Sequence, residues 1–198
     1  MKTKCLWTLF LFSMLFSACA NYQVGGYVQS GVQALLAGNN ETALSYFQAA
    51  AQQDPYYIYS AQLNQSVLSY LGRTQYLTGN YAQARQSLQK ALARNKTDNL
   101  AKLYLGLTQA RLGDTQAGLA NIEASMKQIN GWLKYLNEFW QGEGWDPGGV
   151  IQSGINNALG MIASGNITWP RLYYDGESVG LAVEKTEETF RQLSIDAT

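Results

Sequence analysis

Histidine is absent from this chain, and only two of its 198 residues are cysteines. Histidine is the commonest general base and metal ligand and cysteine supplies the thiol nucleophile, so the usual side chains for acid–base, metal and thiol chemistry are missing. No glycine-rich phosphate-binding motif is present either. We therefore predict no catalytic residue, no metal site and no cofactor.

Charge is also scarce. Charged residues make up 14% of the sequence, below the ~25% that is usual in soluble domains. Residues 19–134 hold nine basic and five acidic side chains, a net charge of +4, whereas residues 135–198 hold three basic and nine acidic ones, a net charge of −6. Neither value indicates nucleic-acid binding. The opposite signs favour docking of the second region on the first, although exposed ion pairs contribute only ~0–1 kcal/mol each.

The N-terminus has the pattern of a secretory signal. Basic residues within Met1–Lys4 precede an apolar run over Cys5–Phe16, and small residues follow in Ser17–Cys19. The apolar run is too short to span a membrane as a helix. The sequence therefore predicts export from the cytoplasm.

The segment Phe16–Cys19 resembles the lipobox of bacterial lipoproteins, with Phe16 where Leu is usual. The resemblance implies that residues 1–18 are a signal peptide and that Cys19 is acylated and becomes the first mature residue. Because Ala20 is not the Asp associated with inner-membrane retention, it implies lipid anchoring to the outer membrane, facing the periplasm. The alternative is an ordinary signal peptide that is cleaved near Ala20. In either case the mature domain has no disulfide.

One glycine pattern occurs three times in the first two thirds of the chain. Counted from its first Gly, a second Gly follows after seven residues, a small residue after twelve, a large apolar residue after sixteen and a small residue after nineteen. The first Gly lets two helices approach closely, and the second ends a helix in the left-handed conformation. The copies are 41 and 34 residues apart, and 34 is the period of a helix-turn-helix solenoid. The three copies are Gly31, Gly38, Ala43, Phe47, Ala50; Gly72, Gly79, Ala84, Leu88, Ala91; and Gly106, Gly113, Gly118, Ile122, Ser125.

These copies resemble the tetratricopeptide repeat (TPR) family. The match is closest over Gly38–Ala50, which continues to Asp54-Pro55, and weaker in the third copy, where Gly118 replaces the usual Ala. The resemblance covers roughly residues 22–130. It implies an all-α fold, a TPR-type helical solenoid of three helix-turn-helix repeats within residues 19–130. The three repeats lie at about 25–55, 56–97 and 98–130.

Helix breakers and apolar periodicity set the expected helices. The seven additional residues between copies one and two lack breakers after Pro55, so we expect the third helix to start early, near Tyr56. Tyr56, Tyr57 and Tyr59 are expected to cover the side of the first repeat, or alternatively to form a ligand platform. The predicted pairs are 23–37 with 41–53, 56–78 with 81–94, and 98–112 with 115–130.

Residues 131–198 are expected to form a helical capping region, since the open end of a solenoid needs a cover. Gly131 interrupts the helical pattern there, and a second helix is predicted over 149–164. Trp169-Pro170 is expected to be extended, because the residue before a proline disfavours the helical conformation. The aromatic and apolar residues that are expected to bury against the third repeat are Trp132, Leu136, Phe139 and Trp140.

The last segment allows two interpretations. Asp175-Gly176 is typical of a β-hairpin turn, but Val179, Val183 and Phe190 share a helical face and favour a helix that Asp175 would cap. Acidic residues cluster further along this helix. We interpret them as a solvated face rather than a metal or acid–base pair. They are Glu184, Glu187 and Glu188.

The TPR resemblance also implies a function. Such proteins bind partner proteins or peptides in a groove lined by the first helix of each pair, so we predict a non-enzymatic adaptor for an envelope protein or peptide. Arg73 and Tyr76 are of the kind that recognises peptides, and C-terminal helices are expected to cover some of the apolar positions. The alternative is an enzyme or small-ligand-binding protein with its site around Trp145 and Trp169. The groove residues are Val28, Val32, Leu35, Ser69, Arg73, Tyr76, Leu103, Leu107 and Ala110.

Overall fold

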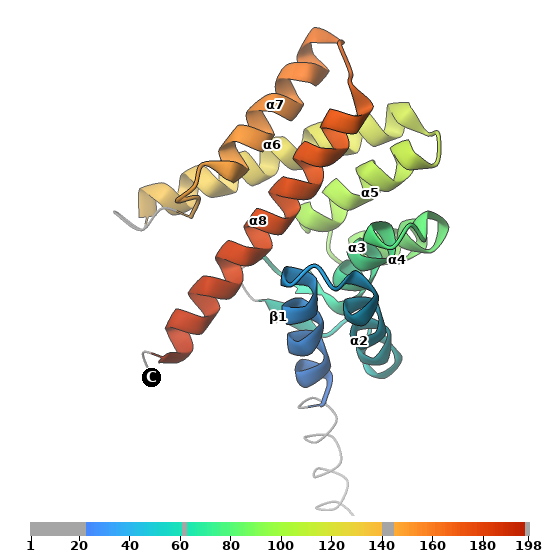
Figure 1. Ribbon diagram of the computed structural model, residues 1–198, viewed down its shortest axis with the longest axis vertical. Coiled ribbons are helices and arrows are strands. Elements are labelled where there is room, and N and C mark those ends of the chain that lie inside the picture. Colours follow the sequence, from blue (N-terminus) through green and yellow to red (C-terminus); the bar gives the residue numbers. More distant parts are fainter. Residues whose placement is uncertain (1–22, 61–62, 140–144, 197–198) are drawn as a thin grey trace, which may run out of the picture.

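Helices make up 80% of the structure, a computed structural model that describes residues 23–60, 63–139 and 145–196 (Figure 1). The fold is the predicted all-α, TPR-type solenoid, in which consecutive helices pack in pairs. The first helix covers residues 23–36 of the described chain. The other elements are α2 (Asn40–Gln53), β1 (Ile58–Ser60), β2 (Gln65–Ser66), α3 (Val67–Leu77), α4 (Tyr81–Arg94), α5 (Asn99–Arg111), α6 (Thr115–Phe139), α7 (Val150–Ser164) and α8 (Trp169–Asp196).

Close approach within each pair depends on the first glycine of the pattern. A Cβ at Gly31 would lie 2.7 Å from the Phe47 ring, and one at Gly72 would lie 2.5 Å from Leu88 Cγ. In the third pair a Cβ at Gly106 would lie 2.8 Å from the backbone of α6. The second glycine of each copy has the left-handed conformation that ends the first helix, with φ of +77°, +79° and +90° at Gly38, Gly79 and Gly113.

The connection into the second repeat differs from the prediction. Instead of an early helix from Tyr56, the chain forms the short antiparallel hairpin β1–β2, with Ile58 opposite Ser66. The helix starts only at Val67, because Ser66 is extended and its side chain accepts a hydrogen bond from the Ser69 backbone N–H at 3.4 Å. The aromatic and β-branched residues before it suit a strand.

The predicted break at Gly131 is also absent. Helix α6 continues through it to Phe139, so the expected end of the repeats at residue 130 falls inside one helix. Gly131 is exposed and a Cβ there would meet nothing within 4 Å, so the glycine lowers helix propensity without ending the helix. Leu136 is buried as predicted, and Trp132 is half-buried. The Phe139 side chain and Trp140 lie outside the described residues.

Helix α8 confirms the helical interpretation of the last segment and corrects its start. It begins at Trp169, so Trp169-Pro170 is not extended, and Pro170 occupies the first turn, where its missing N–H costs nothing. Asp175 therefore lies inside the helix and does not cap it. Its carboxylate accepts a hydrogen bond from Arg171 Nε at 3.0 Å.

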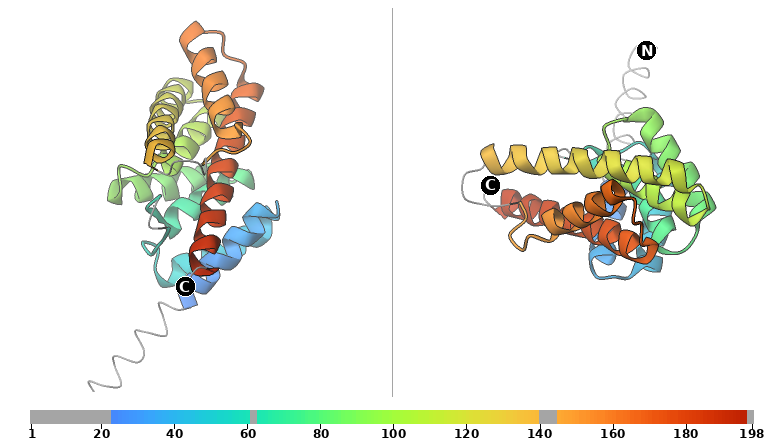
Figure 2. Two further views of the ribbon diagram at one scale, coloured as in Figure 1. Left: turned by 90° about the vertical axis from the view of Figure 1, so that its left-hand side faces the viewer. Right: turned by 90° about the horizontal axis from the view of Figure 1, so that it is seen from above.

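The position of α8 determines what remains of the groove. It runs alongside α7, crosses α5 and extends down toward the first helix and β1 (Figures 1 and 2). It therefore lies across more than one repeat instead of covering the end alone. None of the described helices combines the length and the hydrophobicity that a membrane-spanning segment requires.

Candidate functional site: the repeat groove and helix α8

The eight residues predicted to form the core of the partner-binding groove are all buried. None is more than 3% exposed, and the two proposed recognition residues, Arg73 and Tyr76, are 1% and 3% exposed. In this structure most of the surface that they line is therefore covered, although Leu35 and Arg73 also border a cavity. Its binding role stays a prediction. The eight are Val28, Val32, Leu35, Ser69, Arg73, Tyr76, Leu103 and Leu107.

Two glycines allow α8 to lie directly on α5. A Cβ at Gly176 would lie 2.9 Å from Leu107 Cδ2, and a Cβ at Gly180 would lie 2.6 Å from the Tyr104 hydroxyl. Because these glycines are four residues apart, they occupy one face of α8. The third repeat thus approaches the backbone of α8 closely at these two positions.

A buried ion pair joins α8 to the second repeat. Arg73 Nη1 lies 2.7 Å from Glu184 Oε2, and the two side chains are 1% and 2% exposed. The guanidinium also donates to Gln65 Oε1 at 3.1 Å and to the Gly180 carbonyl at 3.3 Å, and it lies 5.1 Å from the Tyr104 ring centre. Both terminal nitrogens of Arg73 are thus bound inside the molecule, whereas its buried Nε has no hydrogen-bond partner among the described residues.

The Glu184 carboxylate receives three side-chain donors. Besides Arg73, the Tyr70 hydroxyl donates to it at 3.2 Å and Gln65 Nε2 at 3.3 Å. We call Gln65, Tyr70 and Arg73 the carboxylate socket. Burial, and the neighbouring Glu184 charge after it, raise the Tyr70 pKa well above its usual value, so the phenol stays a donor. Buried charged groups in proteins are normally paired and hydrogen-bonded in this way.

Glu187 lies one helical turn after Glu184 and is 6% exposed. Burial, then the Glu184 charge, raises the pKa of its carboxyl to about 8, while a backbone hydrogen bond at Leu63 and the charge of Arg73 lower it. The interpretation of the acidic cluster as a solvated face is therefore wrong for Glu184 and Glu187, because both face the repeats. Glu188 pairs with Arg191, whose Nε donates to it at 2.8 Å.

A third buried carboxylate lies at the start of α5. Asp98 is 1% exposed, and its Oδ1 accepts a hydrogen bond from the Ala101 N–H at 2.8 Å as the helix cap. Burial raises its pKa to about 6, against the lowering effect of that hydrogen bond. The charges of Arg73 and Glu184 both act on this carboxyl. The charge of Arg73 therefore acts on three buried acids, and Glu184 is the one that forms an ion pair with it.

Tyr76 contacts α8 nearer its start. Its hydroxyl donates to Glu177 Oε1 at 2.6 Å, and burial followed by this hydrogen bond raises the Tyr76 pKa. Arg111 lies 3.8 Å from the same carboxylate and 3.7 Å from the Tyr173 ring centre. Both recognition residues predicted from the sequence thus bind acidic groups of α8.

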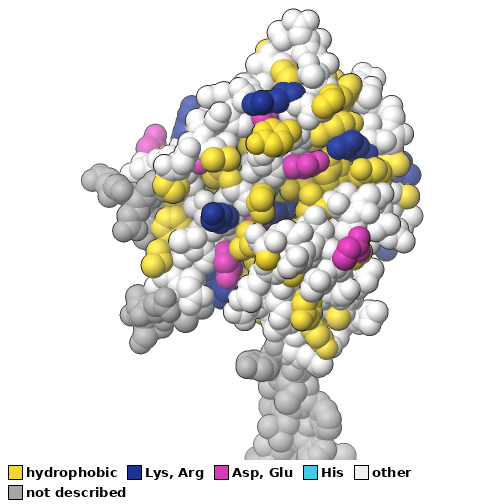
Figure 3. All heavy atoms as spheres, viewed as in Figure 1, with side chains coloured by type: hydrophobic (Ala, Val, Ile, Leu, Met, Phe, Trp, Pro, Cys, Tyr) yellow, Lys and Arg dark blue, Asp and Glu magenta, His cyan; other side chains and the backbone are white. Residues whose placement is uncertain are grey.

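Part of the groove remains open. A cavity of about 270 Å³ lies between the turn after the first helix, α3 and α8. Leu35 and Leu77 line it from the repeats, while Tyr174 and Leu181 line it from α8, where they are 62% and 44% exposed. On the face seen in Figure 3, hydrophobic side chains lie among charged ones. This open groove, defined by Leu35, Leu77, Tyr174 and Leu181, can receive apolar side chains of a partner.

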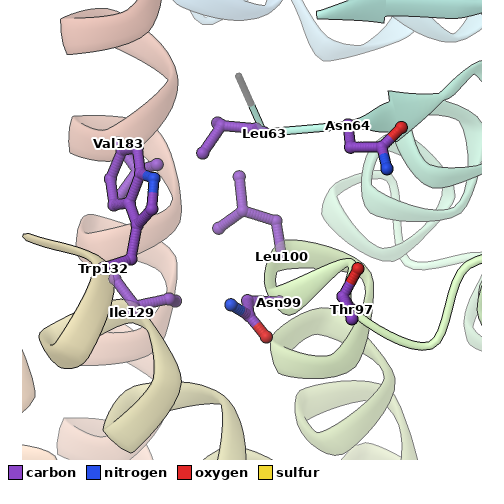
Figure 4. A pocket seen from close by; sticks show the side chains of 8 residues that line it. All are labelled: Leu63, Asn64, Thr97, Asn99, Leu100, Ile129, Trp132 and Val183. Atoms are coloured by element: carbon purple, nitrogen blue, oxygen red, sulfur yellow. The ribbon is translucent and has the colours of Figure 1, made fainter. Parts of the chain in front are cut away.

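A second cavity of about 320 Å³ lies where the second and third repeats meet α6 and α8 (Figure 4). Asn64, Thr97 and Asn99 provide its polar lining, and the remainder is apolar. Leu100 and Val183 are seen in Figure 4 on facing sides, from α5 and α8. The described lining residues carry no charge, so the cavity offers hydrogen bonds to amides and hydroxyls but no charged group.

Trp145 and Trp169, the centre of the alternative site, both pack against neighbouring side chains. Trp145 is 1% exposed, stacks on Phe190 with ring centres 4.3 Å apart, and meets Trp132 edge-on at 5.1 Å. Trp169 is half-buried against Tyr173 at 5.6 Å. Both indoles pack against other aromatic rings. Among the described residues, no group of three or more acidic, histidine or cysteine side chains could hold a metal ion.

The sequence analysis missed the partner of Arg73. Gly176, Gly180 and Glu184 are spaced four residues apart, and this pattern marks a close-packed face that ends in a charge. That signal, together with one Arg on a helix that has no other charged residue, could have suggested the contact. Cys19, the predicted lipidation site, lies outside the described residues.

Comparison with known proteins agrees with the repeat geometry. Residues 34–107 match the family model of the tetratricopeptide repeat, from the end of the first helix into α5. No curated protein and no solved structure matches the chain. The matched segment is thus similar to repeats that generally mediate protein–protein interactions and typically serve as non-enzymatic scaffolds.

Proposed function

We propose that this chain is a non-enzymatic adaptor lipoprotein of the bacterial outer membrane that binds an envelope protein or peptide through its repeats. The observation that carries the proposal is the groove itself. Its wall holds a helix by residue-specific contacts, and an apolar part of it stays open beside that helix. A groove of this kind suits recognition of a protein segment.

The composition supports a binding role rather than catalysis. The chain has no histidine, and both cysteines precede the described residues. The most strongly perturbed acids, Glu187 and Asp98, are buried among groups that pack α8 onto the repeats. Their altered pKa values are therefore explained by a packed interface.

Anchoring follows from the lipobox resemblance. An acylated Cys19 would be four residues from the first described helical residue, so the tether would span at most ~14 Å. The first repeat would lie beside the membrane. Substitution Cys19→Ser should release the protein from the membrane fraction, and unchanged retention would contradict the anchor.

The open groove is the proposed contact with the partner, because Tyr174 and Leu181 are exposed there. A photo-crosslinking residue at either position in the membrane-anchored chain should give a discrete protein adduct. The matched control is position 46, because Tyr46 is a 36% exposed tyrosine on α2. Adducts of equal yield from all three positions, or from none, would contradict this binding site.

A further inference from the structure

Helix α8 occupies the groove of the repeats in the way that a bound helical ligand would. It contacts α5 through Gly176 and Gly180, and it inserts Glu184 into the carboxylate socket of Gln65, Tyr70 and Arg73. These three residues of α8 follow one another at intervals of four, so a single helical stripe makes all of these contacts.

The socket requires a carboxylate. Arg73 is 1% exposed, and without an acid its charge would be buried and unpaired, which is strongly unfavourable. The α5 side of the groove requires small residues, because side chains at positions 176 and 180 would overlap Leu107 and Tyr104. Charge and shape together therefore define one ligand pattern: small residue, three of any kind, small residue, three of any kind, Glu.

Helix α8 is an imperfect match to this groove. Glu187 brings a second carboxylate to the same buried region, and Arg73 is the only guanidinium buried there among the described residues. The additional acid opposes docking, since burial and then the charge of Glu184 disfavour its ionised form. A helix with the same stripe and a neutral residue three positions after its Glu would fit better.

The geometry points to exchange: the groove beneath α8 binds an amphipathic partner helix that carries the small-x₃-small-x₃-Glu stripe, and α8 holds that place as an internal ligand. The inference rests on the proposed function in taking the groove as a binding surface. It adds the chemistry of the partner and the residue that recognises it.

The probe is a fluorescent peptide of residues 169–196, titrated into the full mature chain and followed by anisotropy. Internal α8 competes at an effective concentration of about millimolar, so binding to the unmodified chain should be weak. In the chain with Glu184→Gln, the internal helix leaves Arg73 without its carboxylate. The peptide should then bind at least ~10-fold more tightly than to the unmodified chain.

Peptide variants test the stripe without risk to the fold of the chain. Glu184→Gln and Gly180→Leu in the peptide should each weaken binding by at least ~10-fold, whereas Glu187→Gln should strengthen it. The matched control is Thr189→Ala, because Thr189 is an exposed residue of α8 that is not among those lining the open groove. This change should alter binding by less than ~3-fold.

Two outcomes would overturn the inference: no binding of the unmodified peptide to the Glu184→Gln chain, or equal binding of the Glu184→Gln peptide. If the Glu184→Gln chain does not fold by circular dichroism, the Gly176→Ala chain replaces it, since the added methyl meets only the Leu107 side chain. Crosslinked adducts from the open groove together with absent peptide exchange would refute this inference and leave the proposed function standing.

Discussion

The repeats make two kinds of interface from the same helices, and the two differ in chemistry. Within each pair, contact is apolar and close, as between Gly31 and Phe47 or Gly72 and Leu88. Between the repeats and α8, contact includes buried charge, with Arg73 and Glu184 at its centre. Apolar packing tolerates approximate complementarity, whereas a buried ion pair penalises every arrangement that separates its charges. The α8 interface is therefore more sensitive to a single substitution and to pH.

The largest expected effect comes from separating the buried pair. Arg73→Met leaves Glu184 buried without its cation and should lower the free energy of unfolding by about 3–5 kcal/mol. Denaturant unfolding, monitored by tryptophan fluorescence, measures this change. The double variant Arg73→Met with Glu184→Met removes both charges and should recover roughly 2 kcal/mol of that loss. If the double variant is as unstable as the single one, the ion pair does not determine how α8 packs on the repeats.

The second prediction concerns pH. The Glu187 pKa is raised from 4.5 to about 8 in the folded state, so its contribution to stability is complete below pH 4.5 and is lost as the pH rises through about 8. Asp98 acts in the same direction but at lower pH, because its pKa is about 6. From about pH 6 to 8 the unmodified chain should therefore lose roughly 2–3 kcal/mol.

Denaturant unfolding across this pH range tests the assignment. Glu187→Gln should remove most of the slope, because the neutral amide does not titrate. Glu188→Gln is the matched control, since Glu188 pairs with Arg191 and should leave the slope in place. Equal slopes in all three proteins would show that Glu187 is not the titrating group.

These contrasts also explain which features the sequence could predict. The three helix pairs follow from glycine spacing, because close approach at Gly31, Gly72 and Gly106 is a property of neighbouring helices. The occupant of the groove does not follow, because Arg73 and Glu184 are 111 residues apart. In a sequence, acids at helical spacing with nearby basic residues look like a solvated face.

Local signals also competed at the connection into α3. The run from Tyr56 has no breaker and fits a helix, yet β-branched and aromatic residues also favour a strand. Ser66, as an N-cap, decided the outcome by starting the helix at Val67. The groove residues predicted from the TPR resemblance are buried, and their burial depends on α8, which no repeat pattern describes.

The third prediction tests the apolar interface within a pair. Gly72→Ala places a methyl 2.5 Å from Leu88 Cγ and 3.1 Å from the Leu88 backbone N, which cannot move aside. The substitution should destabilise the chain by about 1–3 kcal/mol. Gly176→Ala on α8 meets only the mobile end of Leu107 and should cost less. Denaturant unfolding measures the destabilisation caused by each substitution. If Gly176→Ala were the more destabilising, the helices within a pair would be less closely packed than α8 is on α5.

The smallest expected effect lies where neither interface is involved. Gly131 lies in the exposed part of continuous helix α6, and a Cβ there meets nothing within 4 Å. Gly131→Ala should therefore raise the free energy of unfolding by about 0.5–1 kcal/mol through helix propensity alone. A scan of thermal unfolding by circular dichroism detects the shift. A destabilised variant would mean that the helix breaks at this position, as the sequence pattern suggested, and that the C-terminal region begins as a separate unit. An increase in stability would show that α6 is one continuous helix that joins the repeats to the C-terminal region.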